Sequence, residues 1–202
     1  MPTPKVLSIQ RIRALLKEVE GLPDDEVFQF WETHGREIVE CAQHSATLTS
    51  AVLGKERHAL ALECLWGTSV KSAVAMWNDE PCRDVLLHAC QLTDPSDQKA
   101  RENALCALIN LSIDSSVAQA MWRHGVCHRA IRDACMEEST TVSEDAVWLL
   151  SNLMSSKFCV IEFWADTALR QAVIAHAAAS RNVQVRVRAV ECVARTARYQ
   201  PE

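Results

Sequence analysis

A repetition that runs through the whole chain restricts the fold of this sequence more than any other feature. Four tryptophans recur at intervals of 46, 45 and 42 residues: Trp31, Trp77, Trp122 and Trp164. Two related phrases, ENALCALINLS from Glu102 and EDAVWLLSNLM from Glu144, lie 42 residues apart. Periods of 20 to 50 residues are typical of stacked supersecondary units, and the spacing seen here excludes a 34-residue repeat.

Each repeat resolves into three helical segments. The first carries the tryptophan and is predicted to end at Gly35 or Gly125, or just before Pro81, because these residues punctuate helices. The second is a mixed apolar and polar segment such as CRDVLLHACQL. The third carries apolar residues at i, i+4 and i+7, the spacing of a buried helical stripe.

The third segments are predicted to begin at four positions, each to within about four residues. These positions are Lys55, Asp97, Thr141 and Asn182. The spacing of Thr141 and Glu144 also fits a capping box at the start of the third of these helices. Glycine and proline are scarce, at 5 and 6 residues, and strand-like alternation is essentially absent, so the sequence predicts an all-α fold.

Charge and hydropathy exclude several classes of partner. The net charge of −5 and a pI near 5.8 make a nucleic acid an unexpected partner. No run approaches 18 apolar residues, so membrane insertion is not expected. The start of the chain lacks the apolar core of a signal peptide, which favours a cytoplasmic protein, with nuclear or cytoskeletal association also compatible.

The nine cysteines are predicted to be free packing residues, because their number is odd and no CxxC pair occurs. Cys82 and Cys127 occupy equivalent repeat positions, and Cys90 and Cys135 occupy another equivalent pair. The segment that most resembles a metal cluster, His124, Cys127 and His128, offers no fourth ligand. We therefore expect neither a metal nor a cofactor.

The third helical segments resemble those of the armadillo repeat. The stretch Ala146–Leu153 matches the family's A-x-W-x-L-x-N-L signature, and Ala104–Leu111 matches it except that Cys106 replaces the tryptophan. The related HEAT repeat remains an alternative. The resemblance implies a right-handed α-solenoid of about four three-helix repeats.

We expect this solenoid to form a single domain over residues 1–202. A capping helix is predicted at 5–20, followed by repeats at about 26–71, 72–113, 115–156 and 157–199.

The resemblance further implies that the third helices line a concave groove in which tryptophan and asparagine side chains hold an extended peptide. Trp148 and Asn152 form one full pair four residues apart, whereas the first repeat has Glu63 and Gly67 at these positions. Trp148 lies off the apolar stripe and is predicted to be exposed, although packing against the next repeat is the alternative. The predicted groove residues are Asn103, Cys106, Asn110, Asp145, Trp148, Asn152, Arg188, Glu191 and Arg195.

The last repeat has a basic character. Arg181, Arg188 and Arg195 recur every seven residues, so they either attract an acidic part of a ligand or form a solvated terminal face. Glu191 lies between the last two and is placed to neutralise them partly.

Three classes of function follow from these patterns. The leading one is a protein–protein interaction module that binds an extended or helical segment of a partner in the groove. The alternative is a structural subunit of a larger cytoskeletal or trafficking assembly that is built in through its end faces, with self-association or association with another protein through the C-terminal helix. Catalysis is not expected, because no nucleophile–base pair, phosphate loop or paired carboxylate occurs at a useful spacing.

Overall fold

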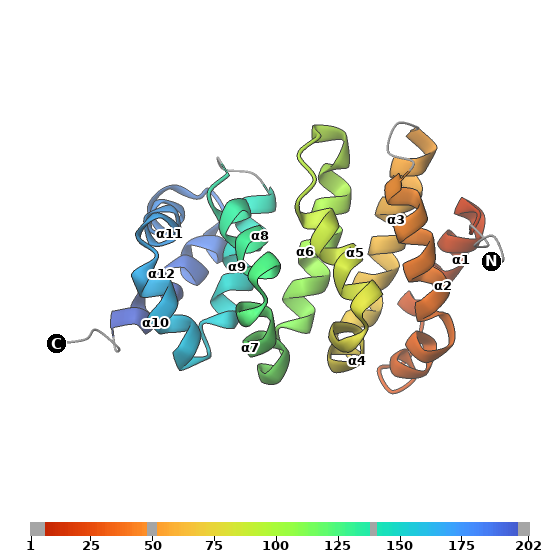
Figure 1. Cartoon of the computed structure of the whole chain (residues 1–202), viewed down its shortest axis with the longest axis horizontal. Helices are drawn as coiled ribbons and strands as arrows, with labels where there is room; N and C mark the ends of the chain where they lie inside the picture. The colour runs from red at the N-terminus through yellow and green to blue at the C-terminus, as the bar shows by residue number, and fades with distance from the viewer. Residues whose placement is uncertain (1–6, 48–51, 138–140, 198–202) are drawn as a thin grey trace. The chain divides into compact units, whose positions relative to one another are not determined.

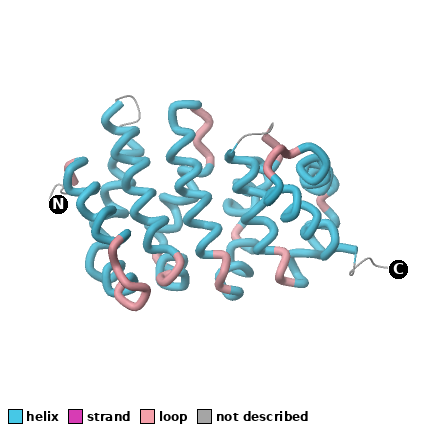
Figure 2. Tube along the Cα trace, turned by 180° about the vertical axis from the view of Figure 1, so that it is seen from behind, coloured by secondary structure: helices cyan, strands magenta, loops and turns pink. Residues whose placement is uncertain are grey.

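The computed structural model describes residues 7–47, 52–137 and 141–197, and over these ranges the chain is helical and contains no strand. Figure 2 shows helix along nearly all of the described trace, joined by short loops. Contacts divide the chain into two compact units, Met1–Leu111 and Ser112–Glu202, and the boundary falls two residues before the predicted end of the second repeat. In the described part of the chain, no helix combines the length and the apolar character needed to cross a bilayer.

The helices follow one another as labelled in Figure 1. Unit 1 contains α1 (Ile9–Glu20), α2 (Val27–Thr47), α3 (Val52–Ser69), α4 (Ala73–Asn78), α5 (Glu80–Cys90), a short 3₁₀ helix (Pro95–Asp97) and α6 (Gln98–Leu111). Unit 2 contains α7 (Ser115–Arg123), α8 (Gly125–Cys135), α9 (Thr141–Leu153), α10 (Lys157–Ala165), α11 (Thr167–Ala179) and α12 (Val183–Ala197).

The predicted third helices are α3, α6, α9 and α12. They begin at Val52, Gln98, Thr141 and Val183, each within four residues of the predicted position, so these predictions are confirmed. The all-helical fold is compatible with a solenoid, whereas the handedness and the number of repeats stay predictions. The predicted capping helix corresponds to α1, and residues 5 and 6 lie outside the described residues.

Successive third helices run parallel within each unit. In unit 1, the amide of Asn103 donates to the carbonyl of Ala59 at 2.9 Å, and the amide of Asn110 donates to the carbonyl of Trp66 at 3.5 Å. Both partners advance by seven residues, so α3 and α6 point the same way. In unit 2, α9 and α12 are parallel by the same test, because their contacting residues also rise in number together.

Three corners between a first and a second helix share one construction. A tryptophan near the end of the first helix is followed two positions later by a residue that caps the second helix, and six positions later by a basic residue that contacts the tryptophan. The three sets are Trp77, Asp79 and Arg83; Trp122, His124 and His128; and Trp164, Asp166 and Arg170.

The capping residue satisfies a backbone N–H that has no partner within the helix. The carboxylate of Asp79 accepts from the N–H of Cys82 at 2.8 Å, and that of Asp166 accepts from the N–H of Leu169 at 3.0 Å. At the middle corner, Nδ1 of His124 accepts from the N–H three residues later at 3.4 Å. The cap therefore fixes where each second helix begins.

The basic residue ties the second helix back to the tryptophan. Nη1 of Arg83 donates to the carbonyl of Trp77 at 3.3 Å, and its guanidinium carbon lies 5.8 Å from the centre of the indole. Arg170 makes the same two contacts with the tryptophan six residues before it. At the middle corner, the ring of His128 packs against Trp122 with centroids 4.4 Å apart. His124 and His128 thus have structural roles at the corner.

The first repeat lacks this corner, and the prediction that a helix ends at Gly35 is wrong. Helix α2 runs without interruption from Val27 to Thr47. At the capping position stands Thr33, whose hydroxyl donates back to the carbonyl of Gln29 at 2.8 Å inside the same helix. Gly35 is buried beneath the indole of Trp31, so its missing side chain makes room for the ring.

The acidic residue of the predicted capping box at the start of α9, Glu144, bonds to residues that precede α12. The carboxylate of Glu144 accepts a hydrogen bond from the hydroxyl of Ser180 at 2.9 Å and another from the amide of Asn182 at 3.2 Å. It therefore links α9 to the segment that precedes α12.

The cysteines act as small apolar packing residues. None of the nine forms a disulfide, and the repeat-equivalent Cys82, Cys127, Cys90 and Cys135 are all buried. Burial raises the pKa of the Cys90 thiol to about 12. In the described residues, no three histidine, cysteine or acidic side chains lie close enough together to hold a metal ion.

A buried histidine lies in the core of unit 1. The side chain of His58 is 1% exposed, and its Nε2 has no hydrogen-bond partner among the described residues. The pKa of His58 is lowered to about 4. Burial is the main cause and the nearby His88 adds to it, whereas Asp97 opposes the shift. His58 is therefore neutral in the folded chain near neutral pH.

Replacing Gly35 with alanine is predicted to destabilise unit 1. The added methyl group would lie 2.6 to 2.8 Å from three ring atoms of the buried Trp31. Overpacking of this kind costs about 1–3 kcal/mol, against a gain in helix propensity of roughly 1 kcal/mol, so we expect a net loss of about 1 kcal/mol. Gly125→Ala is the matched control, because no atom lies within 4 Å of its added methyl group. Chemical denaturation measures both, and equal effects would contradict the packing role of Gly35.

The burial of His58 predicts a loss of stability in acid. Its pKa is about 4 in the folded chain and about 6.5 when exposed, so the unfolded chain takes up a proton first as the pH falls. The free energy of unfolding should fall between pH 6.5 and pH 4, by about 3 kcal/mol in total at 1.36 kcal/mol per pKa unit. Denaturation of the wild type and His58→Leu at several pH values isolates this contribution. Identical pH profiles for the two chains would contradict it.

Candidate functional site

Two of the six tryptophans lie on third helices, and both keep part of their surface exposed. Trp66 is on α3 and is 37% exposed, while Trp148 is on α9 and is half-buried. On the first helices, Trp31, Trp77 and Trp122 are buried, whereas Trp164 is also partly exposed. Large aromatic side chains that remain accessible are frequent anchors of binding surfaces.

Trp148 lies beneath an arginine from the next third helix. The guanidinium carbon of Arg188 on α12 is 5.0 Å from the centre of a Trp148 ring, within the range of a cation–π contact. The exposure of Trp148 therefore lies between the two predicted alternatives. The indole is neither fully exposed nor packed away inside the unit, because an arginine covers part of it.

The charged residues of α12 form a network with α9. Arg188 pairs with Glu191 at 3.1 Å, and Glu191 also accepts a hydrogen bond from the hydroxyl of Ser151 at 3.2 Å. Nη1 of Arg195 donates to the carbonyl of Ser151 at 3.0 Å. The structure thus brings three predicted site residues of α12 together beside Trp148. Their positive charge is partly neutralised, as the position of Glu191 predicts.

Asn152 and Asp145 flank Trp148 along α9. Asn152 follows Trp148 by four residues and Asp145 precedes it by three, so both lie on neighbouring parts of the same helix face. Both side chains are partly exposed. The amide of Asn152 donates to the hydroxyl of Ser112 at 3.0 Å. An amide carries two N–H donors and one carbonyl acceptor.

Asn103 in unit 1 is not an accessible site residue, in contrast to the prediction. Its side chain is 1% exposed and its amide donates to the carbonyl of Ala59 on α3. The position belongs to the face of α6 that packs against α3, where an asparagine ties two parallel helices together. A buried amide held in this way is part of the packing between the helices.

The other predicted residues of unit 1, Cys106 and Asn110, are partly exposed. The amide of Asn110 donates to the backbone carbonyl of Trp66, an exposed tryptophan of the neighbouring third helix. Sequence reasoning missed Trp66, because alignment of the repeats places Glu63 and Gly67, and not Trp66, at the positions of Trp148 and Asn152. The available signal was that Trp66, like Trp148, falls outside the 42–46-residue series of first-helix tryptophans.

The candidate residues therefore form two groups, one in each unit. The group in unit 2 consists of Asp145, Trp148, Asn152, Arg188, Glu191 and Arg195. The group in unit 1 consists of Trp66, Cys106 and Asn110. Each combines an aromatic surface with an amide side chain. Such a combination can bury an apolar side chain and pair with a peptide backbone.

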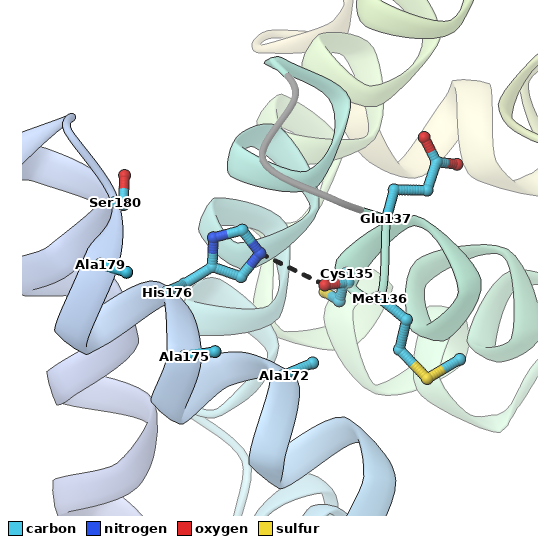
Figure 3. A pocket seen from close by; sticks show the side chains of 8 residues that line it. All are labelled: Cys135, Met136, Glu137, Ala172, Ala175, His176, Ala179 and Ser180. Atoms are coloured by element: carbon cyan, nitrogen blue, oxygen red, sulfur yellow. Dashed lines mark hydrogen bonds between the residues drawn. The ribbon is translucent and has the colours of Figure 1, made fainter.

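A cavity of about 280 Å³ lies between α8 and α11 of unit 2, and Figure 3 shows the residues that line it. The helix α11 contributes a row of small side chains, including Ala172, Ala175 and Ala179. Nε2 of His176 lies 3.3 Å from the carbonyl of Cys135, so the ring is engaged with the protein itself. The rest of the lining is mainly apolar, with Glu137 and Ser180 as its other polar residues.

A second cavity, of about 370 Å³, lies in unit 1 and is lined by residues of α2, α3 and α5. His58 and His88 contribute to its wall together with Asp84. The side chains of Asp84 and His88 are exposed and supply accessible polar groups, whereas the Nε2 atom of His58 is buried.

Comparisons with protein families, with curated proteins and with solved structures found no match to this chain. The armadillo resemblance therefore depends on the residues of the third helices alone.

Proposed function

We propose that the chain is a non-catalytic protein–protein interaction module that binds an extended or helical segment of a partner protein. The proposed site is the group around Trp148 in unit 2. The observation that carries the proposal is the partly exposed indole of Trp148, held beneath Arg188 and beside Asn152. An armadillo-like repeat is the fold that we infer from the third-helix signature, and the parallel third helices support it.

The residues around Trp148 suit a peptide better than a small polar metabolite. An indole provides a large apolar surface at a small cost in side-chain entropy, which is why tryptophan is enriched among binding anchors. The amide of Asn152 matches the donors and acceptors of a peptide backbone, whose polar groups lose water on binding. A partner with an apolar side chain at the indole and backbone groups beside Asn152 therefore fits the site.

The positive charges of the site lie on α12, so an acidic part of a ligand is expected at that side of the site. Arg188 and Arg195 supply two positive charges, Glu191 balances one of them, and Asp145 on α9 adds a second negative charge. Because both arginines already bind groups of the protein, an acidic ligand would have to share them. We therefore expect charge to tune the choice of partner, and the apolar contact with Trp148 to supply most of the binding energy.

A structural role in a larger assembly is the second candidate. The exposed apolar residues of α12 favour it, because Val183, Val187 and Val190 are 57%, 46% and 55% exposed. Apolar residues that recur along one helix face indicate a surface that another helix covers.

Removing the Trp148 side chain is predicted to weaken binding without unfolding the chain. Peptides selected from a random display library against the purified chain provide the ligand. Trp148→Ala should raise the dissociation constant of the tightest such peptide about 30-fold, which corresponds to roughly 2 kcal/mol for an interface hot spot. Asn152→Ala should have a smaller effect, about fivefold, since a single hydrogen bond contributes roughly 1 kcal/mol. Fluorescence anisotropy measures both.

Phe158→Ala is the matched control for this experiment. Phe158 is also an exposed aromatic residue of unit 2 beneath an arginine, with the guanidinium carbon of Arg123 at 5.1 Å, but it lies on a first helix. Its removal should leave peptide affinity unchanged. Circular dichroism checks that each variant keeps its helical content. Unchanged peptide affinity of the Trp148→Ala variant would count against the proposed site. So would a loss of helical content in that variant, because Trp148 would then be needed for folding.

A further inference from the structure

The last helix of the described chain has two apolar faces. One face is buried in unit 2 and carries Val185, Ala189, Cys192 and Thr196. The other face is exposed and carries Val183, Val187, Val190, Ala194 and Ala197, which we call the α12 stripe. The stripe residues follow one another at spacings of four, three, four and three. This alternation is the pattern with which two helices pack along a common line.

The equivalent face of α9 shows what covers such a surface within the protein. The residues 43 positions before Val190, Ala194 and Ala197 are Val147, Ser151 and Met154, and each is 1% exposed or less. Ser151 contacts α12 directly, since its hydroxyl donates to Glu191 and its carbonyl accepts from Arg195. A parallel helix therefore packs where α9 presents this face. From Val190 onward the α12 stripe is the equivalent face, and it is exposed, with no helix of the described chain packed upon it.

The charges beside the α12 stripe identify a self-complementary occupant. Arg186 precedes Val187 and Glu191 follows Val190, so the two charges flank the stripe on opposite sides. In a parallel helix pair, flanking residues five positions apart face each other across the interface. Arg186 of one copy would thus face Glu191 of the other, and the pair would occur twice by symmetry. An antiparallel pair would place like charges opposite each other.

Both flanking residues also make contacts inside the protein that hold them in place. Nη1 of Arg186 donates to the carbonyl of Ser180 at 2.8 Å, and Glu191 pairs with Arg188. A guanidinium has five N–H donors and a carboxylate accepts several hydrogen bonds, so a further partner fits both groups.

We propose that the α12 stripe is a homodimerisation surface, on which α12 of a second copy packs in parallel orientation. The two helices bury the valines and alanines of the stripe against each other, with Arg186 and Glu191 paired across both edges. The stripe itself lies apart from Trp148, which is on α9, and Glu191 is a residue that both proposed surfaces use. The valine and alanine side chains of the stripe bury less area than a standard protein–protein interface does. The dimer is therefore weak, and the dimeric fraction depends on protein concentration.

Sedimentation velocity of the purified chain over a wide concentration range tests the proposal. The wild type should change from monomer to dimer as its concentration rises. Val187→Glu and Val190→Glu should each raise the dimer dissociation constant at least about tenfold, because they place a carboxylate in an apolar contact. Ile174→Glu is the control, since Ile174 is 46% exposed on α11 of the same unit and lies outside the stripe. It should dimerise like the wild type.

Cysteine cross-linking tests the orientation. In a parallel pair, residue 183 of one copy faces residue 183 of the other, and the same is true of residue 190. Val183→Cys and Val190→Cys should therefore each form a disulfide-linked dimer under mild oxidation. The wild type reports any background linkage through its native thiols, eight of which are buried. An antiparallel pair would link at most one of the two variants.

Three outcomes would overturn the proposal. A wild-type chain that stays monomeric at all concentrations would overturn it. The same follows if Ile174→Glu disrupts the dimer as strongly as Val190→Glu, or if Val183→Cys fails to link while Val190→Cys succeeds. Trp148→Ala should dimerise normally, so failure of the peptide site and failure of the dimer surface are distinguishable.

Discussion

The corner formed by a tryptophan, a capping residue and a basic residue is the interaction on which the three-helix repeat depends. At Trp77, Trp122 and Trp164 it ends one helix, starts the next and joins the two across six residues of chain. Each contribution is modest, since a cap contributes about 1 kcal/mol and a cation–π contact about as much. Together they fix the direction in which the second helix leaves the first, and so the place where the third helix packs.

The length of the repeats made most of the fold predictable. A third helix offers an apolar stripe over 13 to 18 residues, and this long signal located its start to within four residues in all four repeats. The continuous helix α2 was not predictable from a glycine alone. A glycine indicates a helix end unless its packing is known, and the packing of Gly35 beneath Trp31 is visible only in the structure. The local signal was Thr33, which stands where the other repeats have Asp79, His124 or Asp166.

The candidate site was predictable only where a residue departs from the repeat pattern. Trp148 was found because its spacing places it off the buried stripe, and its partial exposure is consistent with this position. Asn103 was misassigned, because contact with Ala59 of a helix 44 residues away decides its burial, and spacing within one helix does not reveal such a contact. The cover of Trp148 by Arg188 likewise depends on the packing of α12 against α9.

The burial of eight cysteines has a consequence for the lifetime of the folded chain. While the units are closed, burial keeps the pKa of thiols such as Cys64 and Cys192 near 12, and these thiols are inert toward oxidants. Opening of a unit returns its thiols to water and to their ordinary acidity, where they cross-link readily. In an oxidising solution each opening event is thus a chance of irreversible loss. The lifetime of the protein in such a solution is therefore set by the rate at which its units open, and not by its equilibrium stability.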